Sequence, residues 1–468
     1  MEAALNMDVA RLSGMFTETD SNVIADIELM LPDGEIIITD VPADADGRDL
    51  LEHLHGVANF RGHVLFGGQR VNEDDLVSDL GLQVGGRLQV SANRDDEVVV
   101  MDNGSDTIKA GFGGDDTPCV IEQSVVGYDK QWRGRPQEGT PSFVGTEAFE
   151  RHSTNLLKRP IEHGMVTDWE NMEVLWRHVF ENSLGVSSCS GALMTEPPLN
   201  PKDNRERMTQ MMFESFHLPQ FYLALTPVLA LYASGRTSGL SLDSGYAVTH
   251  CVPIYEGYSL PHAIQRNDRN SGRDLTDFLS QLLPESGIRL STSAERLIVR
   301  DMKEKLCRVS LDFDHEVNTA MSQEYTMPDS TVVTVNNQMI RVPEVMFKPY
   351  LDGSSRRHFS IHEILKRTIF DNDIDLHRVL MENIVLSGGN TKFVNYGERM
   401  EAEVKQLVPN PMMSSWVHTV VPRENDSLFS AWTGGALLSA LSTFEGMWLT
   451  MEMYNEKGPR AIHEVCFS

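Results

Sequence analysis

The chain has 468 residues and a formal net charge of −28 at pH 7, with 68 Asp and Glu against 40 Lys and Arg. A chain of this length is expected to divide into about three domains. The acidic balance argues against nucleic acid or an anionic membrane as a direct partner, because both would repel it. The five cysteines are scattered without close pairing, which is typical of reduced thiols and not of a disulfide scaffold.

The first residues lack the basic start and apolar run of a signal peptide. Residues 1–21 show no clear period and are predicted to be a flexible tail or a short helix. The most apolar helix candidate, residues 221–233, contains Pro227 and is too short to span a membrane. It is therefore predicted to be a buried helix.

Residues 22–92 are predicted to form a compact unit in the order strand, strand, helix, strand, strand. The predicted strands are residues 24–31, 36–41, 63–66 and 87–90, and the helix is residues 49–55. This order, and the stretch HVLFGGQRVNEDDLVSDLGLQVGGRLQV in particular, resembles ubiquitin. The resemblance implies an α+β ubiquitin-like β-grasp domain.

This unit is not expected to act as a conjugating tag, because it ends without a diglycine tail and contains no lysine. Two interpretations remain, a fixed docking module and a solubilising or space-filling domain. Leu65 falls at the centre of the recognition face of ubiquitin, but Ser91 stands where an apolar residue is expected, which counts against ordinary ubiquitin receptors. The near absence of a linker favours packing against the rest of the chain.

The stretch VVVMDNGSDTIKAGFGGDD at residues 98–116 is predicted to be a β-hairpin. A buried strand ends at Asp102, and the NGSD that follows is turn chemistry because Asn and Gly tolerate positive φ. Backbone N–H groups, the Ser105 hydroxyl and Lys109 at its tip suit a phosphate, and Asp102 could hold a metal through water. Taken by itself, this stretch could also be an ordinary acidic turn that binds no phosphate.

A second stretch, GLSLDSGYAVTHCVPI at residues 239–254, has the same order of apolar strand, Asp243, small hydroxyl, glycine and return strand. Two such hairpins imply two similar half-domains that face each other. Two carboxylates would then converge on one cation, with phosphates held between the two loops. A third glycine turn, VLSGGN at residues 385–390, is a candidate for the nucleoside end.

Long strings in the remainder of the chain resemble actin. They include RPIEHGMVTDWENME, LMTEPPLNPKDNRERMTQMMFE, LYASGRTSG, AERLIVRDMKEKLC and LSTFEGMWLT. The resemblance covers residues 95–468 and implies an α/β fold of the actin and hexokinase type, with two α/β halves around a nucleotide cleft. The first half would comprise residues 95–225 and 425–468, and the second residues 226–424.

The resemblance also implies a bound ATP or ADP with Mg²⁺ or Ca²⁺. Asp102 and Asp243 match the carboxylates that hold the hydrated cation, and His250 matches the histidine that helps to order the attacking water. The remaining matches are the phosphate and nucleoside contacts: Gly104, Ser105, Lys109, Ser244, Gly245, Lys303, Glu304, Gly388, Gly389 and Phe393.

The departures from the actin pattern cluster at the phosphate end. Asp106 replaces a glycine and would repel phosphate, and Tyr246-Ala247 replaces a permissive Asp-Gly. Thr226 replaces the glutamine that positions water, and Leu428 falls where a lysine packs on adenine. Hydrolysis is therefore predicted to be absent or very slow. Nucleotide binding is expected to persist, the alternative being that the retained residues serve only the hairpins.

Two loops that make filament contacts in actin are altered. Residues 128–142 are charged with two prolines, and residues 348–360 are polar and basic. Apolar contacts stabilise an interface by about 25 cal/mol per Å², so weak or no self-polymerisation is expected. The cleft that receives partner helices in actin is retained, with core packing as the alternative; its residues are Tyr232, Gly235, Thr237, Leu438, Leu441 and Phe444.

Three functions remain open at this point. The favoured one is a divergent actin-like structural or scaffolding protein of a larger cytoskeletal, ciliary or nuclear assembly, located in the cytoplasm and cytoskeleton. The second is a polymerising actin with ATPase activity. The third is a ubiquitin-pathway adaptor on an actin platform. The altered loops favour the first over the second, and the missing diglycine counts against the third.

Overall fold

The computed structural model describes residues 23–30, 36–42, 50, 54, 62–66, 69–70, 87–92, 97–129, 141, 143–151, 155–186, 188–290, 292–319, 322–353, 359–421 and 426–466. The chain forms two compact units. One comprises Met1–Glu97 and Arg177–Cys189, and the other comprises Val98–Trp176 and Ser190–Ser468. None of the helices within the described ranges is both long and apolar enough to cross a membrane.

The first unit is built on a five-stranded sheet in the order β2-β1-β5-β3-β4. Strand β1 pairs antiparallel with β2 and parallel with β5, and β5 pairs antiparallel with β3. The unit also contains the π-helix η1 (His178–Ser183). The strands are β1 (Val23–Met30), β2 (Ile36–Pro42), β3 (Gly62–Phe66), β4 (Gln69–Arg70) and β5 (Arg87–Ala92).

The four strands predicted before residue 92 are confirmed to within two residues at their ends. Ile27 and Leu29 of β1 are fully buried, as alternation along a half-buried strand requires. Of the predicted helix at residues 49–55 only Leu50 and Leu54 are described, and both are buried at the i, i+4 spacing of one helix face. The predicted tail at residues 1–21 lies outside the described residues.

The second unit contains two large sheets, of which the first has the order β24-β15-β14-β6-β7-β8. Strands β6, β14 and β15 are parallel and buried, while β6, β7 and β8 form an antiparallel meander. The strands are β6 (Val98–Asn103), β7 (Thr107–Phe112), β8 (Val120–Gln123), β14 (Gly191–Glu196), β15 (Gln220–Leu225) and β24 (Leu449–Thr450).

Smaller sheets and helices accompany this first large sheet. The small strands are β9 (Val126–Asp129), β10 (Phe143–Val144), β11 (Asn155–Lys158), β12 (Ile161–Glu162) and β13 (Met165–Val166). The helices are α4 (Gly145–Glu150), α5 (Trp169–Arg177), α6 (Lys202–Glu214), α7 (Thr226–Ala233), α16 (Asp426–Ser439), η6 (Ser442–Met447), α17 (Met451–Lys457), η7 (Pro459–Ala461) and α18 (Ile462–Val465).

The second large sheet has the order β18-β17-β16-β22-β23, with β19 paired to β17. Its strands are β16 (Gly239–Ser244), β17 (Thr249–Tyr255), β18 (Tyr258–Ser259), β19 (Gln265–Asn267), β22 (Ile384–Ser387) and β23 (Thr419–Val420). The antiparallel pair β20 (Gln323–Thr326) and β21 (Val332–Val335) stands apart from it.

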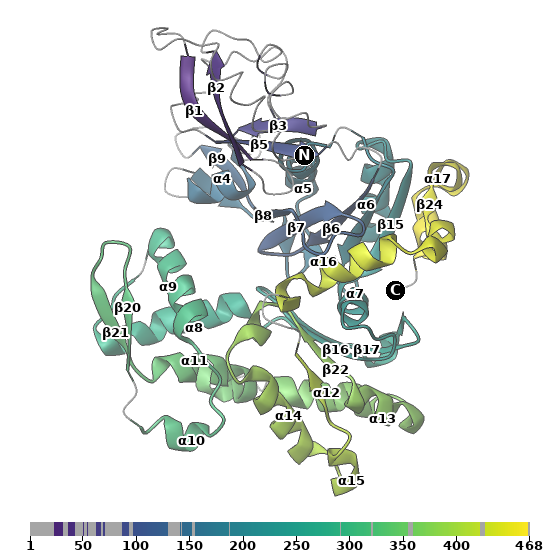
Figure 1. Ribbon diagram of the computed structural model, residues 1–468. Helices are drawn as coiled ribbons and strands as arrows, with labels where there is room; N and C mark the ends of the chain where they lie inside the picture. The colour runs from purple at the N-terminus through teal and green to yellow at the C-terminus, as the bar shows by residue number, and fades with distance from the viewer. Residues whose placement is uncertain are drawn as a thin grey trace, which may run out of the picture. The chain divides into compact units, whose positions relative to one another are not determined.

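The longer helices that accompany the second large sheet share a continuous apolar core with strands β16 and β22. In Figure 1, α12, α13 and α14 lie beside β16, β17 and β22. The helices are η2 (Pro261–Ala263), α8 (Gly272–Leu282), η3 (Leu283–Ser286), α9 (Ser293–Leu306), α10 (Phe313–Glu316), α11 (Gln338–Phe347), η4 (Pro349–Asp352), α12 (Ile361–Phe370), α13 (Ile374–Glu382), η5 (Gly389–Lys392), α14 (Tyr396–Leu407) and α15 (Pro411–Ser414).

Helices α7 and α16 run side by side across the molecule's second unit (Figure 1). Two glycines on α16 make this close approach possible: a Cβ on Gly434 would lie 1.9 Å from the Leu229 carbonyl oxygen. The Trp432 indole, also on α16, donates to the Val100 carbonyl of β6 at 3.0 Å. Helix α16 is thus fixed against both α7 and the first large sheet.

The prediction of one buried helix at residues 221–233 is wrong in its first half. Phe221 begins the buried part of strand β15, which runs parallel to β14, and the helix α7 begins only at Thr226. Pro227 lies in the first turn of α7, where its missing N–H costs nothing. A continuous apolar run does not by itself separate a buried strand from a buried helix.

Candidate functional site

A cavity of about 480 Å³ in the second unit is lined by both predicted hairpins and by the third glycine turn. A cavity of this size is in the usual range for a small-molecule site. Hairpins β6–β7 and β16–β17 confirm the two strand–Asp–strand predictions, and β22 ends at Ser387 directly before Gly388. The three stretches singled out from the sequence therefore meet at one cavity.

The acidic end of the cavity is formed by Asp102 and Asp243. Asp102 pairs in register with Lys109, whose Nζ lies 2.9 Å from the Asp102 carboxylate, and it accepts from the Thr195 hydroxyl at 2.9 Å. Asp243 accepts from the Ser387 hydroxyl at 3.1 Å. Burial and the charge of Asp102 raise the pKa of Asp243 to about 6. Two nearby buried carboxylates with one lysine favour a bound cation.

The lysine is held in its charged form by the same pair. Burial lowers the pKa of Lys109, but the carboxylates of Asp102, Asp243 and Asp106 together outweigh burial and the net shift is upward. Lys109 is therefore a permanent positive charge within the cavity lining. A phosphate bound there would meet a cation already fixed in position.

The hairpin tips are tight turns closed by backbone hydrogen bonds. Gly104 N–H donates to Thr107 O at 3.2 Å, and Gly245 N–H donates to Val248 O at 3.0 Å. A Cβ at Gly104 would lie 2.5 Å from Thr107 O, so this position requires glycine. The Ser105 hydroxyl accepts from Gly164 N–H at 2.8 Å and keeps its own proton free to donate.

Two of the predicted phosphate and nucleoside contacts have side chains that hydrogen-bond within the protein. Ser244 is fully buried, bonds Thr249 and Asn390, and does not line the cavity. Lys303 lines the cavity, but its Nζ donates to Gly272 O at 3.2 Å. The other predicted contacts line the cavity: Gly104, Ser105, Lys109, Gly245, Glu304, Gly388, Gly389 and Phe393.

The third glycine turn approaches the second hairpin very closely. Gly388 has φ +86°, and a Cβ there would lie 2.4 Å from Ser244 O and 2.7 Å from Asp243 Oδ1. Leu428 lies against Gly389 and also lines the cavity. Glycine at position 388 is therefore what brings the turn to the carboxylate.

His250 is the clearest sign that the cavity takes a polar ligand. It lines the cavity, is 2% exposed, and its Nε2 has no hydrogen-bond partner within the described part of the chain. Burial and Arg266 lower the pKa of His250 to about 3, so the ring is neutral at physiological pH. An unpaired buried nitrogen is costly unless a water or ligand meets it.

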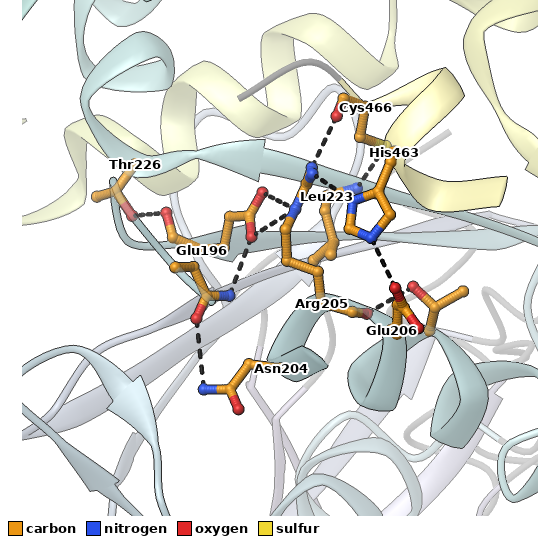
Figure 2. Close-up of polar contacts among 10 residues, drawn as sticks. Glu196, Asn204, Arg205, Glu206, Leu223, Thr226, His463 and Cys466 are labelled. Atoms are coloured by element: carbon orange, nitrogen blue, oxygen red, sulfur yellow. Dashed lines mark hydrogen bonds and ion pairs between the residues drawn. The ribbon is translucent and has the colours of Figure 1, made fainter. Parts of the chain in front are cut away.

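Thr226 also lines the cavity, but its hydroxyl is already used. Thr226 Oγ1 donates to Glu196 O at 3.1 Å (Figure 2). The Glu196 carboxylate in turn binds the buried Arg205, which donates to the Cys466 carbonyl near the C-terminus (Figure 2). Thr226 therefore offers a water an acceptor at most, whereas a glutamine offers both a donor and an acceptor.

Sequence reasoning missed the partners of Asp106. The structure does not leave this carboxylate bare: Arg300 and Arg159 both bind it, and the Tyr246 ring lies beside both guanidinium groups. The Asp106 carboxylate is thus fixed between two guanidinium groups of the protein and is not the isolated charge that the sequence suggests. Arg159 stands in the RPIEHG string and Arg300 in AERLIVRD, but 194 residues separate Arg300 from Asp106.

The residues assigned to the partner cleft lie at the ends of two packed helices. Tyr232 lies in the last turn of α7 with Gly235 just beyond it, while Leu438 lies in the last turn of α16 and Leu441 precedes η6. Leu441 is 53% exposed. Thr237 is exposed and accepts from Gly257 N–H, whereas Phe444 is buried against Tyr222 and Trp448 and belongs to the core.

Most of the first altered loop and the middle of the second fall outside the described residues. Residues 130–140, 142 and 354–358 are among those not described. Tyr350 in η4 is exposed, and Phe359 is exposed with the Arg367 guanidinium carbon 4.2 Å from its ring centroid. The prediction of weak self-polymerisation therefore stays a prediction.

Comparison with known families agrees with this geometry. A family model described as Actin matches residues 94–467, close to the predicted 95–468 and four fifths of the chain. Actin-family proteins generally bind ATP or ADP with a divalent cation and generally work in multi-protein or cytoskeletal assemblies. The sheet of residues 23–92 lies outside the match. The chain therefore belongs to the actin family.

Proposed function

We propose that the protein is a divergent actin-like scaffolding subunit that holds ATP or ADP with Mg²⁺ or Ca²⁺ and turns ATP over poorly or not at all. The observation that carries this proposal is the cavity in which Asp102, Asp243, Lys109 and the unpaired His250 nitrogen converge. This set supplies carboxylates for a cation, a fixed positive charge for phosphate and one unsatisfied polar atom.

The residues present fit a nucleotide with its cation. No group of three or more His, Cys, Asp or Glu side chains that could hold a metal lies within the described ranges. A cation would therefore depend on Asp102 and Asp243 together with phosphate oxygens and water. Lys109 and the tips at Gly104 and Gly245 would face the phosphates. The nucleoside would lie near Glu304, Gly388, Gly389 and Phe393, with Lys303 behind it.

Poor turnover is supported by the contacts of Thr226. Hydrolysis requires a water held in line with the terminal phosphate, and a positioning group is worth orders of magnitude in rate. Thr226 donates its proton to Glu196 O, and the neutral His250 alone remains to orient a water. Bound nucleotide would then act as a structural ligand that joins the two parts of the fold.

Two further parts of the proposal concern assembly. The polar character of residues 128–142 and 348–360 supports weak or absent self-polymerisation. The helix ends at Tyr232 and Leu441 are proposed to receive a helix of a partner in a cytoplasmic cytoskeletal, ciliary or nuclear assembly. Neither a membrane nor nucleic acid is proposed as a partner.

Residues 22–92 are proposed to form a ubiquitin-like docking module. Support comes from the sheet order β2-β1-β5-β3-β4, with β1 and β5 parallel and the remaining neighbours antiparallel. The buried pair Leu50 and Leu54 matches a helix that covers one face of such a sheet. The absence of lysine before Lys109 supports a fixed module over a tag.

The proposed function is tested by measuring phosphate release and sedimentation of the full chain under polymerising salt, with a conventional actin as the reference. The proposal predicts phosphate release slower than the reference by about two orders of magnitude or more and no pelleted protein. Filaments that pellet with concomitant phosphate release would establish the second candidate, a polymerising ATPase, and overturn this one.

A further inference from the structure

A compact cluster of four side chains joins the tips of both hairpins at the cavity. We call Asp106, Arg159, Tyr246 and Arg300 the tip cluster. Asp106 belongs to the first hairpin tip and Tyr246 to the second, while Arg159 follows β11 and Arg300 is on α9. Asp106, Tyr246 and Arg300 line the cavity. The cluster thus draws on four separate segments of the second unit.

The centre of the tip cluster is a carboxylate in a two-pronged ion pair. Arg300 Nη1 donates to Asp106 Oδ1 at 3.0 Å, and Nη2 lies 2.7 Å from Oδ2. Arg159 Nη1 lies 3.5 Å from Oδ1 and donates to Ser105 O at 3.2 Å. The Asp106 side chain is only 12% exposed. This parallel geometry is the one in which Arg binds carboxylates and phosphates most strongly.

The aromatic ring of Tyr246 completes the arrangement. Its centroid lies 5.1 Å from the Arg159 guanidinium carbon and 5.8 Å from that of Arg300. The third N–H direction of Arg300 is also occupied, because Nε donates to Glu304 at 2.9 Å. The Nε, Nη1 and Nη2 atoms of Arg300 therefore each bind a carboxylate of the protein.

The guanidinium groups of Arg159 and Arg300 lie beside the two hairpin tips, and together they form a site for an anion. In this protein the Asp106 carboxylate occupies that site. We propose that Asp106 acts as a built-in anion which takes the place of a terminal phosphate, so that the site selects a nucleoside diphosphate over a triphosphate. This inference rests on the proposed function, since it names the ligand class of the same cavity.

The selectivity follows from charge and space together. A diphosphate meets Lys109 and the cation held by Asp102 and Asp243 without reaching the tip cluster. A third phosphate would have to enter beside Asp106 and compete with it for Arg159 and Arg300. Like charges a few ångströms apart in a partly shielded site repel strongly. Because Arg159 and Arg300 already link Asp106 of the first tip to Tyr246 of the second, no additional phosphate is needed to connect the two tips.

The test is calorimetric titration of the nucleotide-stripped full-length protein with Mg·ADP and, separately, with the imido analogue of Mg·ATP, which is not hydrolysed. The wild-type protein is expected to bind the diphosphate about tenfold more tightly or better. In Asp106→Asn, which keeps the side-chain size and removes the charge, the triphosphate analogue should gain about tenfold while the diphosphate changes little.

Asp116→Asn is the matched control, since it removes one exposed carboxylate near the same hairpin outside the cavity and should leave both affinities unchanged. Asp106→Ser serves if the asparagine variant does not fold. Equal wild-type affinities, or an unchanged ratio in a folded Asp106 variant, would overturn the inference and leave the proposed function intact. A folded wild-type protein that binds neither nucleotide would overturn both.

Discussion

His250 is the residue whose environment makes the sharpest prediction about pH. Its pKa is lowered to about 3 by burial, against an ordinary value of 6.5. Below pH 6.5 the unfolded chain binds a proton here that the folded chain does not. The free energy of unfolding should therefore fall as the pH drops from 6.5 toward 3, by at most about 1.4 kcal/mol per pH unit from this group.

The measurement is urea unfolding of wild type and His250→Gln from about one pH unit above the ordinary histidine pKa to about two units below it. As the pH decreases, the free energy of unfolding should fall more for the wild-type protein than for His250→Gln. His262→Gln, at an exposed histidine, is the control and should give a gap that does not vary in this way. If the difference in free energy of unfolding between wild type and His250→Gln does not change with pH, the His250 ring is not buried in its neutral form.

Arg205 gives a second prediction at this scale. It is buried between the Glu196 carboxylate at 2.9 Å and the Cys466 carbonyl, with His463 Nδ1 at 3.1 Å (Figure 2). Arg205→Met leaves Glu196 buried and unpaired, and should cost about 3–5 kcal/mol in the free energy of unfolding. Arg207→Met, on the exposed face of α6, should cost less than about 1 kcal/mol. Equal costs would show that the ion pair is not what fixes the C-terminal segment.

Among secondary-structure elements, the crossing of α7 and α16 depends most on a single position. A Cβ at Gly434 would lie 1.9 Å from Leu229 O, a backbone atom that cannot move aside. Gly434→Ala should therefore lower the free energy of unfolding by about 1–3 kcal/mol or more, as overpacking does. Thermal melting compares it with Gly446→Ala, where a Cβ meets nothing within 4 Å. A Gly434→Ala protein as stable as this control would contradict the close packing.

The elements also show what sequence reasoning could and could not reach. Both hairpins were predictable because strand alternation and turn residues are local, and a hairpin places Asp102 opposite Lys109 automatically. The strand Gln220–Leu225 was not, because an unbroken apolar run carries no period. Asp106 shows the other limit: its partner Arg300 is 194 residues away, and only the tertiary fold brings the two together.

For the whole molecule, we propose an actin-family body in which ligand binding replaces turnover. Asp102, Asp243, Lys109 and His250 line the cavity and would hold a nucleotide and its cation, whereas Thr226 and the tip cluster would oppose reaction at a terminal phosphate. A nucleotide held between the two large sheets would stabilise the second unit by mass action. The purified protein should then carry its ligand with it.

The most direct test is the nucleotide content of the purified full chain, released by denaturation and separated by anion-exchange chromatography. We expect about one adenine nucleotide per chain, present as ADP, and a large loss of bound nucleotide in Asp243→Asn but not in Asp116→Asn. If the bound nucleotide is ATP instead of ADP, the proposed role of Asp106 is contradicted but the nucleotide site itself is not. Folded wild-type protein with no bound nucleotide would contradict the central claim that this cavity is a nucleotide site.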